Sequence, residues 1–249
     1  MTAAAAPTTQ TATTMVWKVG IFLRLVAFSL QSQPLDIARR VAERETAALE
    51  ARAHYTYRQT VTIEEVSPRG GLYREVREVI FSPTGDRTER FVGNPTQNLV
   101  RLRLTEEDFR DIREVQPFLF TPEVLWLYQT RPRGEDSADG VDCWLLEVRP
   151  RQTHQSQRMF DGLFWVDKRD LSVIKTEGVA VPQILRYKNE NLFPRFTTFR
   201  EKLDGHSFPV HTHSDDTLAF SSGAIRMRMS IRYTDYKRFS ARSTVTFHP

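Results

Sequence analysis

A set of apolar β-type runs separated by turn residues, between Asp139 and Gly178, constrains the fold of this chain more than any other stretch. The dipeptide Asp139-Gly140 is typical of a tight turn, and the Trp- and Val-containing run after it stops at Pro150. A second run begins at Phe164, and the polar group 167–170 separates it from a third run that ends at Gly178. Aspartate favours the first position of a type I turn, so the segment predicts antiparallel hairpins.

The same alternation of strand and turn recurs along the rest of the chain. Further strands are expected at Tyr55–Val66, Leu72–Phe81 and Arg87–Gly93. The loops between them have five residues each and contain Pro and Gly, which makes the three strands neighbours. Asp204-Gly205 and Ser221–Gly223 mark two more turns near the C-terminus. The pattern predicts a mainly antiparallel β protein with helices (α+β), in a single domain over residues 34–249.

The order of these elements resembles that of the outer-membrane lipoprotein carriers, the LolA- and LolB-like proteins. The resemblance is carried by Asp139–Gly178, where an Asp-Gly turn opens a strand closed by Pro and the next strand ends in Trp-Val-Asp. In element order it covers residues 34–240. We therefore expect an open, unclosed β-barrel of about nine to eleven strands covered by a helical lid. The resemblance also implies a cavity that holds the acyl chains of lipoproteins or related lipids.

Three segments have helical signals. Residues 34–53 are expected to form an amphipathic helix, because Pro suits the first turn and apolar residues recur on one face. Thr105 is a good N-cap for a second helix that ends before Pro117, and Thr121-Pro122-Glu123 begins a short third one. The resemblance implies that the first helix and the segment Phe109–Tyr128 form the lid.

A lipid carrier of this kind needs an apolar sheet face and a movable apolar cover. Buried acyl carbons stabilise a complex by about 0.8 kcal/mol per CH₂, so an apolar lining suffices without specific polar groups. Methionine suits such a lining because its flexible side chain repacks at low cost. The lining candidates are Tyr57, Val61, Ile63, Met227, Met229 and Ile231, and the lid candidates are Phe109, Ile112, Phe118, Phe120, Leu125 and Trp126. An alternating apolar stripe is also what an ordinary β core shows.

The first 33 residues are expected to lie outside this domain. Residues 1–14 form an uncharged Ala- and Thr-rich tract that is expected to be disordered. After Met15, a basic residue precedes an apolar run over 19–30 that resembles an export signal, although Arg24 interrupts it. The run is short for a transmembrane helix, and no cysteine follows it as in a lipidated protein. We expect a soluble, exported periplasmic protein, with a disordered or surface-lying leader as the alternative.

Other functions have weaker signals. Lys and Arg outnumber Asp and Glu from Arg186 onward, which favours an anionic partner such as a phospholipid head group. His211 and His213 share one strand face near Asp215, which would suit a metal-assisted hydrolase if further ligands came from elsewhere. The single cysteine, Cys143, excludes an internal disulfide. The nucleophile elbow, the phosphate-binding glycine loop and the zinc-binding His-Glu-x-x-His motif are absent from the sequence.

These observations predict a non-enzymatic periplasmic carrier or binding protein for lipoprotein acyl chains or related lipids. No cofactor or metal is expected. We expect transient contacts with a membrane or with donor and acceptor proteins. The arginines around position 228 alternate with apolar and aromatic residues on the opposite strand face, which argues against a nucleic-acid partner. Two alternatives remain open. One is a regulator or scaffold of the same fold that binds a protein segment, as RseB-like envelope-stress regulators do; the other is a hydrolase that uses His211 and His213.

Overall fold

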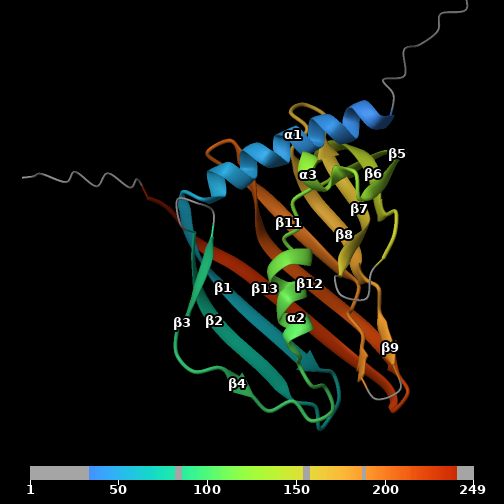
Figure 1. Cartoon of the computed structure of the whole chain (residues 1–249). Helices are drawn as coiled ribbons and strands as arrows, with labels where there is room; N and C mark the ends of the chain where they lie inside the picture. The colour runs from blue at the N-terminus through green and yellow to red at the C-terminus, as the bar shows by residue number, and fades with distance from the viewer. Residues whose placement is uncertain (1–33, 82–85, 154–157, 187–188, 240–249) are drawn as a thin grey trace, which may run out of the picture. The chain divides into compact units, whose positions relative to one another are not determined.

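The computed structural model describes residues 34–81, 86–153, 158–186 and 189–239. In these residues, antiparallel strands form one large sheet, and helices lie along one of its faces (Figure 1). The helices are α1 (Pro34–Arg52), α2 (Glu106–Arg110), the π-helical turn η1 (Asp111–Val115) and α3 (Pro122–Leu125). The strands are β1 (Tyr55–Glu65), β2 (Leu72–Phe81), β3 (Arg87–Phe91), β4 (Thr96–Gln97), β5 (Tyr128–Ala138), β6 (Val141–Pro150), β7 (Met159–Asp167), β8 (Val173–Val181), β9 (Ile184–Arg186), β10 (Asn189–Asn191), β11 (Phe196–Leu203), β12 (His206–Phe220) and β13 (Gly223–Arg238).

The ends of the large sheet stay apart. Its order is β3-β2-β1-β13-β12-β11-β8-β7-β6-β5, with β4 also paired to β2, while β9 and β10 form a separate hairpin. The end strands β3 and β5 do not pair with each other within the described ranges. The sheet is therefore an open surface and not a closed barrel. The fold class expected from the sequence, an open antiparallel sheet covered by helices, is confirmed.

Turn chemistry explains two of the hairpins. Asp139 and Gly140 have φ angles of 49° and 76°, and Asp204 and Gly205 have φ angles of 49° and 81°. Positive φ at both central residues is typical of a type I′ turn, whose twist matches that of the flanking strands. The β5–β6 and β11–β12 hairpins therefore close where the Asp-Gly dipeptides predict turns.

One face of the sheet carries the apolar core. Side chains of β1 and β13 alternate between buried and more exposed positions. The register places Val61 opposite Ile231 and Ile63 opposite Met229 on the buried face. All six residues predicted to line a cavity, Tyr57, Val61, Ile63, Met227, Met229 and Ile231, are buried there.

The helices pack on this apolar face. α1 contacts β5, β12 and α3, so it crosses one end of the sheet, and its Val41 and Ala42 are fully buried. α2 begins with a capping box, in which the Thr105 hydroxyl accepts from the Asp108 backbone N–H and the Asp108 carboxylate accepts from the Thr105 backbone N–H. Ile112 in η1 is buried against the core. The expected N-cap and the expected helical cover are thus both present.

Two features of this region differ from what the sequence predicts. The lid segment Phe109–Tyr128 is helical up to Val115 and again over Pro122–Leu125, and its last residue begins β5. β5 is not predicted by the sequence, since residues 131–136 are exposed, largely charged and contain Pro and Gly. That composition is typical of an edge strand, which needs partners on one side only.

The leader of residues 1–33, including the expected export signal, lies outside the described residues. Each helix in the described part of the chain is too short or too polar to span a lipid bilayer.

Candidate functional site

Three of the six inward residues predicted to line a lipid cavity border a small hollow. Ile63, Met227 and Met229 from the sheet and Ile112 from η1 face it, and its volume is about 50 Å³. A water molecule occupies about 30 Å³ in the liquid. The hollow therefore has no room for an acyl chain while the helices stay in this position. The predicted lining is a packed core in the arrangement seen here.

The predicted lid residues differ in how far they enter this core. Ile112 and Phe120 are buried, whereas Phe109, Phe118 and Leu125 are partly buried against the core cluster. Trp126 is 70% exposed, so it does not pack with the others on the inner face of this segment. It caps the C-terminus of α3, a helix too short to bury both of its sides. Contact with a ligand stays a prediction for all of these residues.

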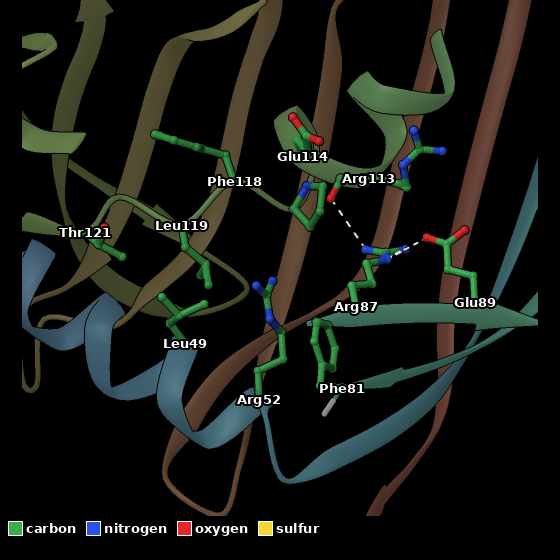
Figure 2. A pocket seen from close by; sticks show the side chains of 11 residues that line it. Leu49, Arg52, Phe81, Arg87, Glu89, Arg113, Glu114, Phe118, Leu119 and Thr121 are labelled. Carbon is green, nitrogen blue, oxygen red and sulfur yellow. Dashed lines mark hydrogen bonds and ion pairs between the residues drawn. The ribbon is translucent and has the colours of Figure 1, made fainter. Parts of the chain in front are cut away.

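A larger cleft of about 670 Å³ lies beside the lid segment (Figure 2). This volume is within the range of about 300–1,000 Å³ that is usual for small-molecule sites. The cleft is built by the end of α1, the end of β2, the start of β3, the π-helical turn η1 and the chain that follows it. Its lining residues are Leu49, Arg52, Phe81, Arg87, Glu89, Arg113, Glu114, Pro117, Phe118, Leu119 and Thr121.

Regular elements position three walls of this cleft, and irregular chain forms the fourth. Leu49 and Arg52 are three residues apart in the last turns of α1, so they lie on the same side of the helix. Phe81 is the last residue of β2 and Arg87 the first of β3. From 116 to 121 the chain has neither helix nor strand, and this segment forms the remaining wall together with Arg113 and Glu114 of η1.

Phe118 joins the cleft to an aromatic cluster beneath the lid. Its ring stacks on that of Phe160, with 5.7 Å between centroids and 12° between planes. The centroids of Tyr128 and Phe120 lie 5.3 Å and 6.3 Å from that of Phe118. Phe160 and Phe120 are completely enclosed, whereas Phe118 is partly exposed. Phe118 therefore contacts both the cleft and the aromatic cluster.

The charges that line the cleft are unevenly paired. Arg87 donates from Nε to Glu89 Oε1 at 2.6 Å and from Nη1 to the carbonyl oxygen of Arg113 at 3.5 Å (Figure 2). Glu89 also pairs with Arg77. Burial would raise the pKa of Glu89, but these two guanidinium groups hold it below its usual value. Arg52, by contrast, has no ion pair with any residue of the described ranges.

The Arg52 side chain extends from the end of α1 into the space between Leu49 and Arg87 (Figure 2). Its guanidinium carbon lies 4.9 Å from the centroid of the Phe81 ring, in cation–π contact. Burial lowers the pKa of the Arg52 guanidinium from its ordinary value, and the nearby positive charge of Arg87 lowers it further. The cleft thus combines apolar walls with a positive charge that no carboxylate of the described chain neutralises.

The predicted histidine pair lies on the other face of the sheet. Thr212 is buried, so its neighbours His211 and His213 point away from the core, and their rings stack at 5.6 Å. His211 Nε2 lies 3.1 Å from the Ser230 hydroxyl, and the carboxylate of Asp215 accepts hydrogen bonds from two arginines, Arg226 and Arg228. Within the described residues, no group of three or more His, Cys, Asp or Glu side chains is arranged to hold a metal ion.

Most of the cleft is not marked by the sequence. Of the predicted residues only Phe118 lines it, and no motif distinguishes Arg52 or Arg113 from the many solvated arginines of the chain. The one usable signal is Leu49, an apolar residue one turn before Arg52, which places that arginine beside the apolar stripe of α1.

Comparison with known proteins gives structural matches alone: no protein-family model and no curated protein matches the chain. A DUF1329 family protein from Desulfovibrio piger is 14% identical with a TM-score of 0.46, over 84% of this chain and 95% of that chain. A LolA superfamily protein from Nitrosomonas europaea is 18% identical with a TM-score of 0.38, over 82% of this chain and 94% of that chain. A chain of the MucA/MucB complex from Pseudomonas aeruginosa is 13% identical with a TM-score of 0.24, over 81% and 99% respectively.

The LolA superfamily is the family that the sequence resembles, and it is found again among these structures. At these identities and TM-scores, no residue role is transferred from any of the three proteins to this chain.

Proposed function

We propose that this protein is a non-catalytic periplasmic carrier or binding protein for the acyl chains of lipoproteins or related lipids. The observation that supports this best is the contact of Phe118 with both the 670 Å³ cleft and the aromatic core. An acyl chain in the cleft would lie against Leu49, Phe81 and Leu119 and would end at the Phe118 ring.

Uptake of a longer part of the chain requires the segment from 116 to 121 to move. This segment has no strand partner, and a five-residue π-helical turn and a four-residue α-helix flank it, so few backbone hydrogen bonds resist its displacement. Displacement of Phe118 would expose Phe160 and Tyr128 to the ligand. The hollow at Met227 and Met229 lies on the same sheet face and can widen because methionine repacks easily.

The energetics suit a carrier, which must release its cargo. Each buried CH₂ contributes about 0.8 kcal/mol, so a chain that is only partly enclosed binds firmly but reversibly. Handover then needs contact with an acceptor membrane or protein at the mouth of the cleft.

The proposed position of the acyl chain beside Phe118 is tested by placing a charge there. In Phe118→Asp, affinity for a fluorescent fatty acid should be lost, because a carboxylate would have to be desolvated beside the acyl chain. Val100→Asp is the control: Val100 is 67% exposed and lies outside the cleft, so the affinity of this variant should equal that of the wild type. Circular dichroism would verify that both variants keep the sheet. Wild-type affinity in a folded Phe118→Asp variant contradicts the proposed path.

Native mass spectrometry of the protein purified from cells separates the alternatives. Co-purified lipid supports the carrier, and a bound metal ion would support a hydrolase at His211 and His213. A bound peptide or protein segment, without lipid, would support a regulator or scaffold of the same fold.

A further inference from the structure

We propose that the cleft contains a subsite for a phosphate group, with the guanidinium of Arg52 as its main ligand. The inference rests on the proposed function and specifies it, since the ligand would be an amphiphile whose phosphate binds at Arg52 and whose acyl chain runs along Phe118. A phosphate can also come from a small soluble compound, so the test has to distinguish the two sources.

The pairing of the buried arginines singles out Arg52. In the part of the chain that the structure describes, five arginines have a buried Nε without a hydrogen-bond partner: Arg52, Arg58, Arg77, Arg158 and Arg200. Four of them pair through an Nη atom with a carboxylate of the described chain: Arg58 with Asp235, Arg77 with Glu75, Arg158 with Asp111, and Arg200 with Glu45. Arg52 has no such partner among the described residues. A largely buried guanidinium without a counter-ion is costly, and an anionic ligand would remove that cost.

The charges around Arg52 strengthen this assignment. Arg87 and Arg113 line the same cleft, and Arg113 also has no ion pair with a described residue. The two carboxylates of the lining do not offset them fully, because Glu89 is shared between Arg87 and Arg77, and Glu114 is exposed to solvent. Arginine is well suited to phosphate, since its planar fork of N–H donors matches two phosphate oxygens.

The apolar residues beside Arg52 favour an amphiphile over a small anion. Leu49 lies one turn before Arg52 on α1, and the Phe81 ring lies under the guanidinium. Leu119 and Phe118 continue the apolar wall toward the core. A phosphate bound to Arg52 therefore has an apolar surface next to it on which an attached acyl chain can lie.

Three ligands provide the test. Oleoyl lysophosphatidic acid has both an acyl chain and a phosphate, monooleoylglycerol lacks the phosphate, and glycerol phosphate lacks the acyl chain. Titration calorimetry below the aggregation concentration of the lipids should show that the wild-type protein prefers lysophosphatidic acid to monooleoylglycerol. Arg52→Gln should weaken lysophosphatidic acid about ten- to hundredfold, the loss expected for one charge-assisted hydrogen bond, and leave monooleoylglycerol unchanged. Arg52→Lys should retain part of the preference, because it keeps the charge but not the fork.

Controls keep the result interpretable. Arg40→Gln removes an exposed arginine of the same helix that does not line the cleft, and it should bind all ligands like the wild type. If Arg52→Gln fails to fold, two other measurements replace it. Arg113→Gln should weaken the preference for lysophosphatidic acid over monooleoylglycerol, and added NaCl should weaken the same preference in the wild-type protein.

The outcomes are distinct. Equal binding of both lipids, or a preference that survives Arg52→Gln, overturns the phosphate subsite while lipid binding stands. Binding of neither lipid overturns the proposed function and this inference together. Glycerol phosphate that binds through Arg52 as tightly as lysophosphatidic acid supports the phosphate chemistry but overturns the lipid as its source.

Discussion

Glu45 on α1 and Arg200 on β11 form an ion pair of 2.8 Å in which both side chains are almost completely buried. The same guanidinium also donates from Nη2 to the carbonyl oxygen of Phe118. One residue of the sheet therefore holds both the helix that crosses the sheet and the irregular segment that walls the cleft. The positions of α1 and of the segment 116–121 over the sheet therefore depend on this arginine.

Removing one partner of this pair should destabilise the protein strongly. Glu45→Ala leaves the Arg200 charge buried and unpaired, and we expect the free energy of unfolding to fall by about 3–5 kcal/mol in urea titrations. Glu43→Ala removes an exposed carboxylate two residues earlier on α1, whose contact with Arg39 is 3.9 Å, and should change stability by about 0.5 kcal/mol or less. Equal effects of the two substitutions would show that the buried pair does not hold α1.

A second buried carboxylate fixes the loop before α2. Glu65 accepts hydrogen bonds from the backbone N–H groups of Gly71, Val100, Arg101 and Leu102. Burial would raise its pKa, but these four donors hold the pKa below the usual 4.5. Glu65→Gln should lower the free energy of unfolding by about 2 kcal/mol, because charge-assisted bonds become weaker ones. Glu64→Gln, on the exposed side of the same strand, is the control and should be nearly neutral.

The pH dependence of this effect has a defined sign. Since the folded-state pKa of Glu65 lies below its unfolded value, its contribution is present above about pH 4.5 and is lost as the pH falls. The stability difference between wild type and Glu65→Gln should therefore shrink on acidification. A difference that stays constant from neutral pH to pH 3 would argue against an ionised Glu65.

Asp111 should act in the opposite direction. It lies in η1, pairs with Arg158 at 2.6 Å and has Asp108 and Arg110 nearby. Burial raises its pKa to about 7, and the neighbouring charge of Asp108 adds to this, although Arg158 opposes it. The folded state therefore binds more protons than the unfolded state between about pH 4 and 7, and stability falls as the pH rises through this window.

Asp111→Asn removes this titration. Urea unfolding at several pH values from 4.5 to 8 should show a flatter profile for the variant, whatever its absolute stability, with a difference in slope of up to about 1.4 kcal/mol per pH unit. Parallel profiles for wild type and variant would show that Arg158 keeps Asp111 ionised throughout.

The sequence predicts the sheet better than the site, for physical reasons. The Asp139-Gly140 and Asp204-Gly205 turns need positive φ, and few dipeptides tolerate it, so their positions are encoded locally. The alternation around Met227 and Met229 likewise records which face is buried. β5 has no such pattern, because an edge strand of charged residues is held by β6 alone.

The cleft depends on which ends of distant elements meet. The three arginines of the cleft, Arg52, Arg87 and Arg113, come together because the ends of α1 and η1 both approach the start of β3. The spacing of residues in the sequence does not predict this approach. Packing of Phe118 against the core can be predicted, because a large apolar residue in an irregular segment has to pack somewhere. The exposure of Trp126 could not be foreseen, since α3 is a single turn whose orientation is set by its neighbours.

A lipid site in the cleft is tested most directly by crosslinking a photoreactive fatty acid to the protein and mapping the modified peptides by mass spectrometry. We expect modification in residues 113–121 and around Leu49, and its loss on competition with unlabelled fatty acid. Modification confined to the outer face around His211 and Asp215, or none at all, would contradict a lipid site in this cleft.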